Sequence, residues 1–228
     1  MLNRMFFAQN ISSEVSTFGY LYNWWVASSG IILPTGWHVP TNDEWNTLGV
    51  ALGGTLNGLY VSWCSHKLKT VGNTVAGTGL WFPGATGDGT NESGMSVKPS
   101  GVRDEYGVFS GRGSDANYWC SDARNDISGF YKNLNYNTQT LFTSSSVIFY
   151  KKNYGFGIRG VKDDSVNPGS VTDYDGNVYP TVKIGNQVWM AENLRVTKYN
   201  NGTSIPNLPN NTDWYNASTG ALCSYENA

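Results

Sequence analysis

The chain has 228 residues and a formal net charge of -2 at pH 7, and only 14% of its residues are charged, against about 25% in an average soluble domain. A hydrophobic content of 39% at this length supports a real core and excludes wholesale disorder. The absence of a basic excess argues against nucleic acid as a partner. No run of 18 apolar residues is present, so we expect no membrane span.

The first part of the chain contains two segments with helical character. Residues 19–27 are apolar and aromatic over a length that fits a short helix or a buried strand. After a loop rich in Pro and Gly, Thr41 and Glu44 have the spacing of a capping box, in which each side chain bonds the backbone amide of the other residue. Apolar residues follow at helical spacing and Gly53 ends them. We therefore expect short helices at about 19–27 and 42–52.

The rest of the chain predicts strands and loops. From residue 55 to 161, short apolar or aromatic runs alternate with clusters of Gly, Asn, Ser and Asp, which indicates antiparallel strands with long loops. Residues 164–170 form a polar linker. Asp175-Gly176 and Gly185-Asn186 then predict two hairpin turns between three strands, and 193–228 predicts coil. The fold class is α+β, with small antiparallel sheets.

Several segments carry a family resemblance. They are GYLYNWW at 19–25, LPTGWHVPTNDEW at 33–45, NESGMSVKPSG at 91–101, NYWCSD at 117–122, YGFGIRGVKD at 154–163 and DYDGNVYPTVKIGNQVWMAENLRVTKYNNGTSIP at 173–206. Together they resemble a Fibrobacter succinogenes major paralogous (FISUMP) domain. That family is similar to the C-type-lectin-like fold of sulfatase-modifying factors and of the variable proteins of diversity-generating retroelements. The resemblance implies this fold and a ligand-binding face, with no established catalytic activity.

The order of the segments differs from the family. There, the segment that resembles DYDGNVY comes first and the one that resembles GFGIRGVKD comes last, whereas here the order is inverted. The resemblance thus implies that residues 1–228 are one circularly permuted domain, or a frame cut from a tandem array. Residues 11–163 correspond to the later two thirds of the family pattern and 171–228 to its opening third.

The permutation leaves two ways to complete the sheet. Residues 171–228 can pack on their own chain, or they can complete the sheet of a neighbouring subunit, which would build rings or filaments head to tail. The candidate assembly residues are Val171, Tyr174, Val178, Tyr179, Val182, Ile184, Val188 and Trp189.

A stretch rich in Tyr and Asn between residues 115 and 153 is the candidate ligand-binding face. Tyr and Asn also dominate antibody paratopes, because they combine rigid contact area with adaptable hydrogen bonding. In the retroelement-diversified relatives, the variable binding face precedes the segment that resembles Gly155 to Arg159. The candidate residues are Asp115, Asn117, Tyr118, Arg124, Asn125, Asp126, Tyr131, Asn133, Asn135, Tyr136, Asn137, Tyr150 and Asn153.

The tryptophans fall into two groups. Trp24, Trp37, Trp45 and Trp189 lie in the family-like segments and are expected in the core. Trp63, Trp81 and Trp214 lie in loop-rich stretches, where an exposed ring can stack on a sugar or on a protein partner.

Metal binding has weak support in the sequence. Asp173, Asp175 and Asn177 mimic the start of a calcium loop, but Ile184 stands where the bidentate Glu belongs, so a hairpin turn explains them better. Asp88, with Asn91 and Glu92, offers oxygens in a polar loop. We expect no cofactor, with a structural calcium ion as the alternative.

Catalysis has weak support too. The three cysteines predict buried free thiols, or one disulfide and one free thiol. Sulfatase-modifying factors use a closely spaced cysteine pair; Cys120 lies roughly where the first would fall, but Asn125 occupies the place of the second. We expect no enzymatic activity.

The expected function is that of a non-enzymatic surface module that binds a protein or a carbohydrate on a cell surface. The alternative is a structural subunit of a fibre or filament, assembled from copies of itself through residues 171–228. The four apolar residues after Arg4 are too few for the core of a signal peptide. We nevertheless expect an extracellular, cell-surface or virion location, reached without a signal or as part of a larger exported protein.

Overall fold

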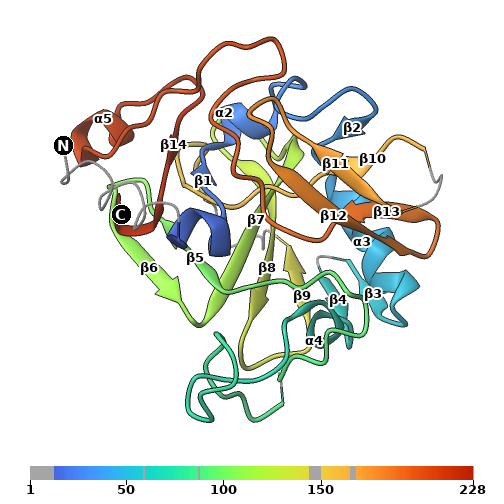
Figure 1. Cartoon of the computed structure of the whole chain (residues 1–228). Helices are drawn as coiled ribbons and strands as arrows, with labels where there is room; N and C mark the ends of the chain where they lie inside the picture. Colours follow the sequence, from blue (N-terminus) through green and yellow to red (C-terminus); the bar gives the residue numbers. More distant parts are fainter. Residues whose placement is uncertain (1–12, 59, 87, 144–149, 165–167, 228) are drawn as a thin grey trace, which may run out of the picture.

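The structure is a computed structural model that describes residues 13–58, 60–86, 88–143, 150–164 and 168–227 (Figure 1). Strands dominate the fold and the helices are few and short, which confirms the predicted α+β class. The apolar residues 5–8 and the middle of the predicted linker lie outside the described ranges.

The larger sheet has seven strands in the order β3-β4-β9-β8-β7-β5-β6. All neighbouring strands pair antiparallel except β5 and β7, which pair parallel through Gly101 and Ala116. The longest hairpin, β7–β8, occupies the middle of this sheet. The strands are β3 (Thr55–Asn57), β4 (Tyr60–Ser62), β5 (Ser100–Arg103), β6 (Phe109–Arg112), β7 (Asp115–Ala123), β8 (Gly129–Asn135) and β9 (Leu141–Thr143).

The second sheet joins distant parts of the chain. Its order is β11-β12-β13-β10-β2, so the late hairpins pair with a strand that follows residue 160, and that strand pairs in turn with one near residue 37. A two-stranded sheet pairs β1 with β14. The strands are β1 (Leu21–Tyr22), β2 (Trp37–His38), β10 (Val161–Lys162), β11 (Ser170–Thr172), β12 (Val178–Ile184), β13 (Gln187–Met190) and β14 (Leu222–Cys223).

The helices confirm one prediction and correct two. Helix α3 (Asn42–Ala51) begins with the expected capping box, because the Thr41 hydroxyl accepts from the amide of Glu44 and the Glu44 carboxylate accepts from the amide of Thr41. The predicted helix at 19–27 is wrong over most of its length, since β1 and the four-residue α2 (Trp24–Ala27) replace it. The predicted coil at 193–228 contains α5 (Asn211–Tyr215), β14 and a 3₁₀ turn (Tyr225–Asn227).

The two predicted turns are confirmed as hairpins. Strands β11 and β12 flank the Asp175-Gly176 turn, and β12 and β13 flank the Gly185-Asn186 turn. Asp173 fixes the first turn by accepting hydrogen bonds from the amides of Asp175 and Asn177 and from the Tyr179 hydroxyl. The oxygens of Asp173 are therefore used within the turn, and Oδ2 of Asp175 accepts from the amide and the hydroxyl of Thr197.

The core lies on both faces of β7–β8, because successive side chains of a strand point to opposite faces. Trp119 and Tyr131 pack into a cluster with Phe156 on one face. Tyr118 and Leu134 pack on the other face into a cluster with Trp45 of α3 and Trp189 of β13. The second cluster therefore joins the two large sheets.

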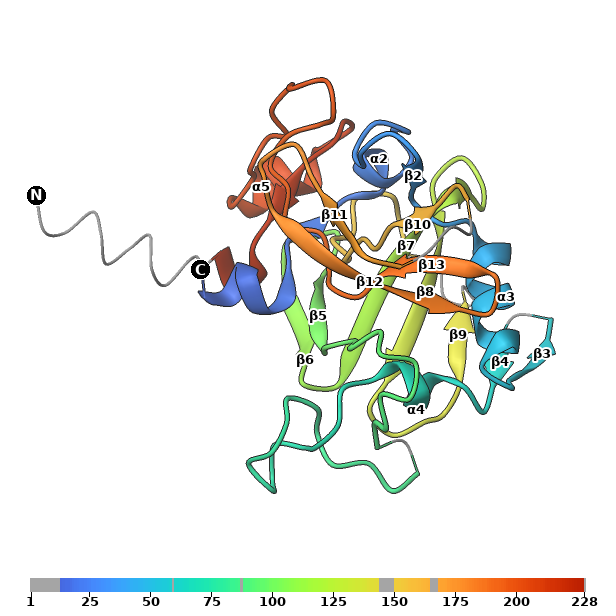
Figure 2. The same cartoon turned by 45° about the vertical axis from the view of Figure 1, so that its right-hand side comes forward.

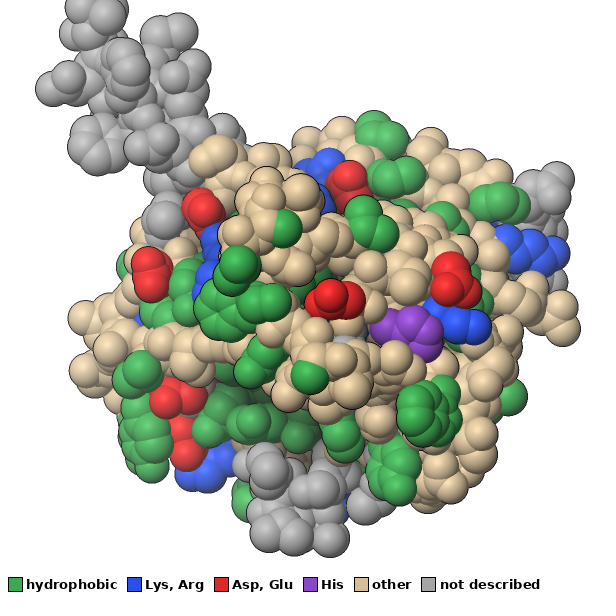
Figure 3. Space-filling view, turned by 90° about the horizontal axis from the view of Figure 1, so that it is seen from below, with side chains coloured by type: hydrophobic (Ala, Val, Ile, Leu, Met, Phe, Trp, Pro, Cys, Tyr) green, Lys and Arg blue, Asp and Glu red, His purple; other side chains and the backbone are tan. Residues whose placement is uncertain are grey.

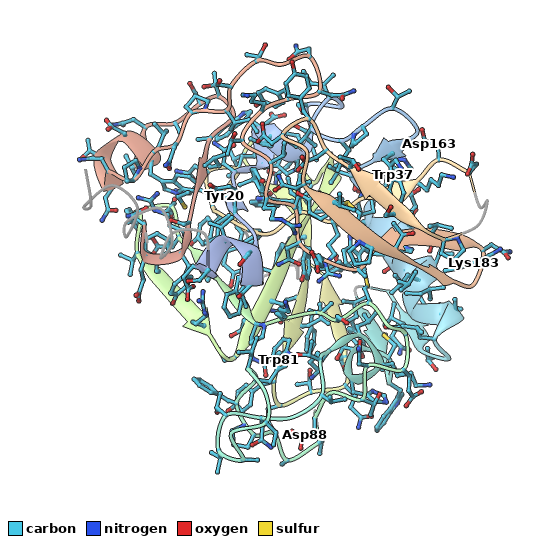
Figure 4. The ribbon with its side chains drawn as sticks, in the orientation of Figure 1. Tyr20, Trp37, Trp81, Asp88, Asp163 and Lys183 are labelled. Carbon is cyan, nitrogen blue, oxygen red and sulfur yellow. The ribbon has the colours of Figure 1, made fainter. Side chains whose placement is uncertain are left out.

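The buried tryptophans include two, Trp81 and Trp214, whose burial the sequence did not predict. Trp24, Trp45 and Trp189 are buried as expected and Trp37 is half-buried, but Trp81 and Trp214 are buried too. Trp81 belongs to the long connection from residue 69 to 99 (Figure 4), and its side chain is buried. The ammonium of the buried Lys69 lies 5.4 Å from its ring centroid and donates to the carbonyl oxygens of Asn135 and Thr138. Burial lowers the pKa of Lys69 to about 8.

Residues 168–227 pack on their own chain. Strand β13 pairs with β10, β14 pairs with β1, and Figure 2 shows the β12–β13 hairpin across the middle of the molecule. Among the candidate assembly residues Tyr174 and Val178 are exposed and Val182 is half-buried, whereas five are buried in this intramolecular packing: Val171, Tyr179, Ile184, Val188 and Trp189.

His38 ties the second sheet to α3. Its Nε2 lies 2.8 Å from a carboxylate oxygen of Glu44, and its Nδ1 lies 2.5 Å from one of Asp163. Asp163 follows β10, beside Trp37 of β2 (Figure 4). The hydrogen bonds that His38 donates to Glu44 and Asp163 raise its pKa to about 9, although partial burial opposes them. His38 is therefore an imidazolium at neutral pH, with a structural role.

Candidate functional site

The predicted ligand-binding face begins with a ladder of polar side chains at one end of the β7–β8 hairpin. Asp115 pairs with Asn135 and Asn117 pairs with Asn133 across the two strands. The Nδ2 group of Asn133 donates to Asp115 at 3.1 Å and to Asn117 at 3.0 Å, and that of Asn135 donates to Asp115 at 2.9 Å. Asn117 is buried, and the other three side chains are half-exposed. These groups mostly satisfy one another, so the ladder orders the hairpin.

A cluster of aromatic rings continues this face. Tyr131 follows Asn133 on the same side of β8, and its ring centroid lies 4.7 Å from that of Tyr150. Tyr150 lies at 4.7 Å from Tyr154, and both rings pack on the buried Phe156. Burial raises the pKa of Tyr150, and burial together with nearby acidic residues raises that of Tyr154 to about 12. The phenols are thus neutral at physiological pH.

Tyr118, another candidate, belongs to the interior. It points to the opposite face of β7, is fully buried, and donates from its hydroxyl to Asn193 at 2.8 Å. The strand alternation explains this placement, because Asn117 and Trp119 face the ladder side.

The remaining candidates lie in three separate places. Arg124, Asn125 and Asp126 form the turn between β7 and β8, where Asn125 accepts from the amides of residues 127 and 128. Tyr136 and Asn137 follow β8 at the other end of the hairpin. Asn153 is buried and donates to the carbonyl oxygen of Tyr215. The structure therefore places the ladder, Tyr131 and Tyr150 on one face. The other candidate residues lie elsewhere in the fold.

The Asn137 end of the hairpin borders a hollow that the sequence did not predict. This hollow has a volume of about 280 Å3 and is lined by Trp63 and by neutral polar residues of 62, 86 and 137–140. Trp63 is 66% exposed. Its φ of +63° lies in the left-handed region, which is unusual for a bulky residue and costs about 1–3 kcal/mol. The Cys64 and Ser65 amides, which follow Trp63, both donate to the Gln139 carbonyl oxygen at 2.9 Å and hold this conformation.

The polar groups of this hollow include an available donor. Asn137 accepts from the amide of Ala85 at 2.9 Å through Oδ1, and its carbonyl oxygen accepts from the Thr86 hydroxyl at 3.0 Å. Over the described ranges, the Nδ2 group of Asn137 has no hydrogen-bond partner. The hollow beside helix α4 (Ser65–Leu68) therefore combines an exposed indole ring with a free amide donor. Figure 3 views the molecule from below and shows hydrophobic side chains over much of that face, with neutral polar surface and scattered charged groups between them.

A cavity outside the predicted face is larger. It has a volume of about 360 Å3 and lies where the helical turn of residues 13–18, the 69–99 connection and the β12–β13 hairpin meet. Lys98, Arg159 and Glu192 line it, and each belongs to a segment on which the family resemblance rests. The sequence of those segments is typical of a structural framework and does not indicate that the three residues line a cavity. The sequence does contain one indication of such a cavity, because these cationic and acidic residues occur within largely apolar motifs.

The cysteines lie in the interior, apart from the hollow and the cavity. Cys64, Cys120 and Cys223 are free and buried, and burial raises the pKa of Cys64 and of Cys223 to about 11. Within the ranges that the structure describes, no group of three His, Cys, Asp or Glu side chains could hold a metal ion. The same ranges contain no helix long and apolar enough to cross a membrane.

One comparison with known proteins identifies a family. The sequence model of the Fibrobacter succinogenes major domain matches residues 3–162 and 182–228. No curated protein and no solved structure matches the chain.

Proposed function

The chain belongs to the Fibrobacter succinogenes major domain family, a family of surface-associated domains, and on this premise we propose that it is a non-enzymatic module that binds a ligand outside a cell or on a virion. The proposed contact surface is the Asn137 end of the face rich in Tyr and Asn, together with the hollow beside Trp63. The ladder and the tyrosine cluster order the strands that present this end.

Trp63 is the single observation that carries the proposal. An indole ring with 66% of its surface exposed loses the stabilisation that burial of an aromatic ring normally provides. Its left-handed backbone adds a further cost. Trp63 therefore contributes little to the stability of the fold, and it lies beside a hollow. Contact with a ligand best explains a tryptophan at this position.

The lining of the hollow favours a glycan over a protein as the ligand. Apart from Trp63 the lining side chains are hydroxyls and amides without charge. Such a surface can stack the apolar face of a sugar ring on the indole and hydrogen-bond its hydroxyl groups. A neutral carbohydrate therefore fits the hollow.

The test compares Trp63→Gly with Tyr106→Ala on an array of neutral oligosaccharides. Glycine accepts the φ of +63° without strain, so Trp63→Gly should leave the free energy of unfolding unchanged or raise it by about 1 kcal/mol. Truncating a central Trp anchor commonly costs about 2 kcal/mol of binding or more, so we expect at least a tenfold loss of affinity. Tyr106 is equally exposed but stacks on Tyr215 of α5, far from α4, and its variant should bind normally. Glycan binding that survives Trp63→Gly contradicts this site.

The state of the thiols and of His38 supports the non-enzymatic part of the proposal. A nucleophilic cysteine needs an exposed thiolate, whereas burial raises the pKa of all three thiols here. A general base needs a free ring nitrogen, and both nitrogens of His38 are bound to carboxylates.

We also propose that the fold is C-type-lectin-like and circularly permuted. The proximity of the two ends of the described chain supports this. The guanidinium carbon of Arg112 lies 3.5 Å from the ring centroid of Phe18 and 4.6 Å from that of Tyr225. A short link between these ends would restore the order of segments in the family. Exchange of 171–228 between subunits, the filament alternative, has less support, because its key residues are buried within one chain.

A further inference from the structure

The cavity of about 360 Å3 between the 13–18 turn, the 69–99 connection and the β12–β13 hairpin has an excess of positive charge. Lys98, Arg159 and Glu192 are its charged lining residues. The Glu192 carboxylate is paired with Nη1 of Arg195 at 2.7 Å, so its charge is already balanced. Lys98 and Arg159 are left without a carboxylate at ion-pair distance in the described part of the chain.

Lys98 is held in a position that suits a negative ligand. It is half-buried, and burial lowers its pKa, with smaller contributions from Arg159 and Arg195 and an opposing one from Glu192. A lysine that loses hydration without gaining a carboxylate is destabilised in its charged form. An anion placed beside Lys98 would remove this penalty.

The guanidinium of Arg159 lines the same cavity as Lys98 and has donor capacity that the fold does not fully use. Its Nε donates to Asn193 at 2.8 Å, and its Nη1 donates to the backbone carbonyl oxygens of Met95 and Met190. Over the described ranges, its Nη2 donates to the carbonyl oxygen of Ser96 at 3.5 Å, and the guanidinium carbon lies 5.6 Å from the ring centroid of Tyr118. The guanidinium is therefore fixed by three groups and retains donor capacity at Nη2.

Two further features of the lining mark a polar site. The hydroxyl of Thr70 is buried and has no hydrogen-bond partner over the described ranges, although a buried unsatisfied polar group costs about 1–3 kcal/mol. Ser96 has a φ of +54°, a left-handed conformation that is costly for a residue with a side chain. Val182 and Pro180 form an apolar wall beside these groups.

We propose that this cavity binds a small carboxylate that also carries hydroxyl groups, of the class of acidic monosaccharides. The carboxylate lies between the Lys98 ammonium and Nη2 of Arg159, since neither cation has a carboxylate partner in the described part of the chain. A ligand hydroxyl bonds the Thr70 side chain, and the apolar face of the sugar packs on Val182. The volume fits such a ligand, since small-molecule sites begin at about 300 Å3. This site is separate from the hollow beside Trp63 and does not depend on it.

The experiment is a calorimetric titration of the full chain with sodium glucuronate, with glucose and inorganic phosphate as comparison ligands. We expect glucuronate to bind, and glucose to bind at least tenfold more weakly because it lacks the carboxylate. Lys98→Met keeps the length of the side chain and removes its charge, so it should weaken glucuronate binding at least tenfold. Lys183→Met is the matched control. Lys183 belongs to the β12–β13 hairpin, which lines the cavity, but it is exposed at the outer end of that hairpin (Figure 4). It should bind as the unaltered chain does.

Thr70→Val gives a second, independent arm. It removes the unpaired hydroxyl while preserving the shape of the side chain, so the chain should fold and unfold at the same temperature or a higher one, with weaker glucuronate binding. No binding of glucuronate, equal binding of glucose, or binding that Lys98→Met leaves unchanged overturns the proposal. Tighter binding of phosphate than of glucuronate also overturns it, in favour of a simple anion site. Trp63→Gly should leave glucuronate binding intact, which separates this site from the proposed glycan hollow.

Discussion

Replacing His38 with Gln should remove a contribution to stability that decreases as the pH rises. The imidazolium of His38 joins β2 to the capping residue of α3 and to Asp163 after β10, three segments far apart in the sequence. Its pKa rises from 6.5 in the unfolded chain to about 9 in the fold. A group whose pKa is raised by folding stabilises fully below its unfolded pKa and loses this effect as the pH rises through the folded one. The stabilisation is therefore complete below pH 6.5 and disappears between 6.5 and about 9.

The magnitude follows from the shift and from the exposure of the groups. A rise of the pKa from 6.5 to about 9 would correspond to about 3 kcal/mol if solvent did not screen the pairs. The His38 side chain is 40% exposed and that of Asp163 55%, so screening by water reduces the effect substantially. We expect about 1 kcal/mol, which the Gln variant lacks because Gln does not titrate in this range.

The assay is denaturant unfolding of both chains at pH 6 and pH 9.5. Lys69 and Lys132, whose pKa values burial lowers to about 8, also titrate in this window and act in the opposite direction. They are common to both chains, so the difference in free energy of unfolding between the two cancels them. We expect this difference to shrink by about 1 kcal/mol from pH 6 to pH 9.5. A difference that is the same at both values, or an NMR titration of His38 near 6.5, would refute the reasoning.

Three other predictions follow from the fold. Asp173→Ala leaves the buried Tyr179 hydroxyl without its acceptor, so unfolding free energy should fall by about 1–3 kcal/mol; a melting temperature of the unaltered chain that rises with calcium contradicts the turn assignment. The three buried thiols should react with a thiol reagent only as fast as the chain unfolds, and rapid labelling of the native chain contradicts their burial. A variant that joins the two ends and opens the chain between Asp164 and Pro168 should retain its circular dichroism spectrum and melt cooperatively, because Phe18 and Tyr225 already share Arg112; an unfolded product contradicts the permuted order.

Local features of the fold could be predicted from the sequence because local interactions determine them. The capping box at Thr41 needs only the backbone within three residues. The two hairpins need only the turn residues and the strands beside them. At β1, in contrast, the apolar stretch from 19 to 27 fits a helix as well as a strand, and its pairing with β14 decided between them. That partner lies outside any sequence window.

Burial and the sites depended on distant contacts in the same way. Trp214 is buried because its indole donates to the carbonyl oxygen of Asp104 and its ring packs under Arg103, which no local pattern indicates. The strand alternation of β7 could have placed Tyr118 on the face opposite the polar ladder, since it neighbours Asn117. The cavity beside Lys98 forms only where four separate segments come together. Their proximity in space could not be predicted from the sequence.

The pairing of β1 with β14 also has a consequence for how the chain is made. Leu21 and Tyr22 leave the ribosome early, but their partners Cys223 and Leu222 are added about 200 residues later. At about 5–20 residues per second, synthesis leaves β1 without its neighbour for roughly 10–40 s. Over that interval the aromatic segment from 19 to 27 is exposed to chaperones and to other nascent chains. This part of the fold can close only after β14 has been synthesised, so its yield depends on how well the earlier segment is protected.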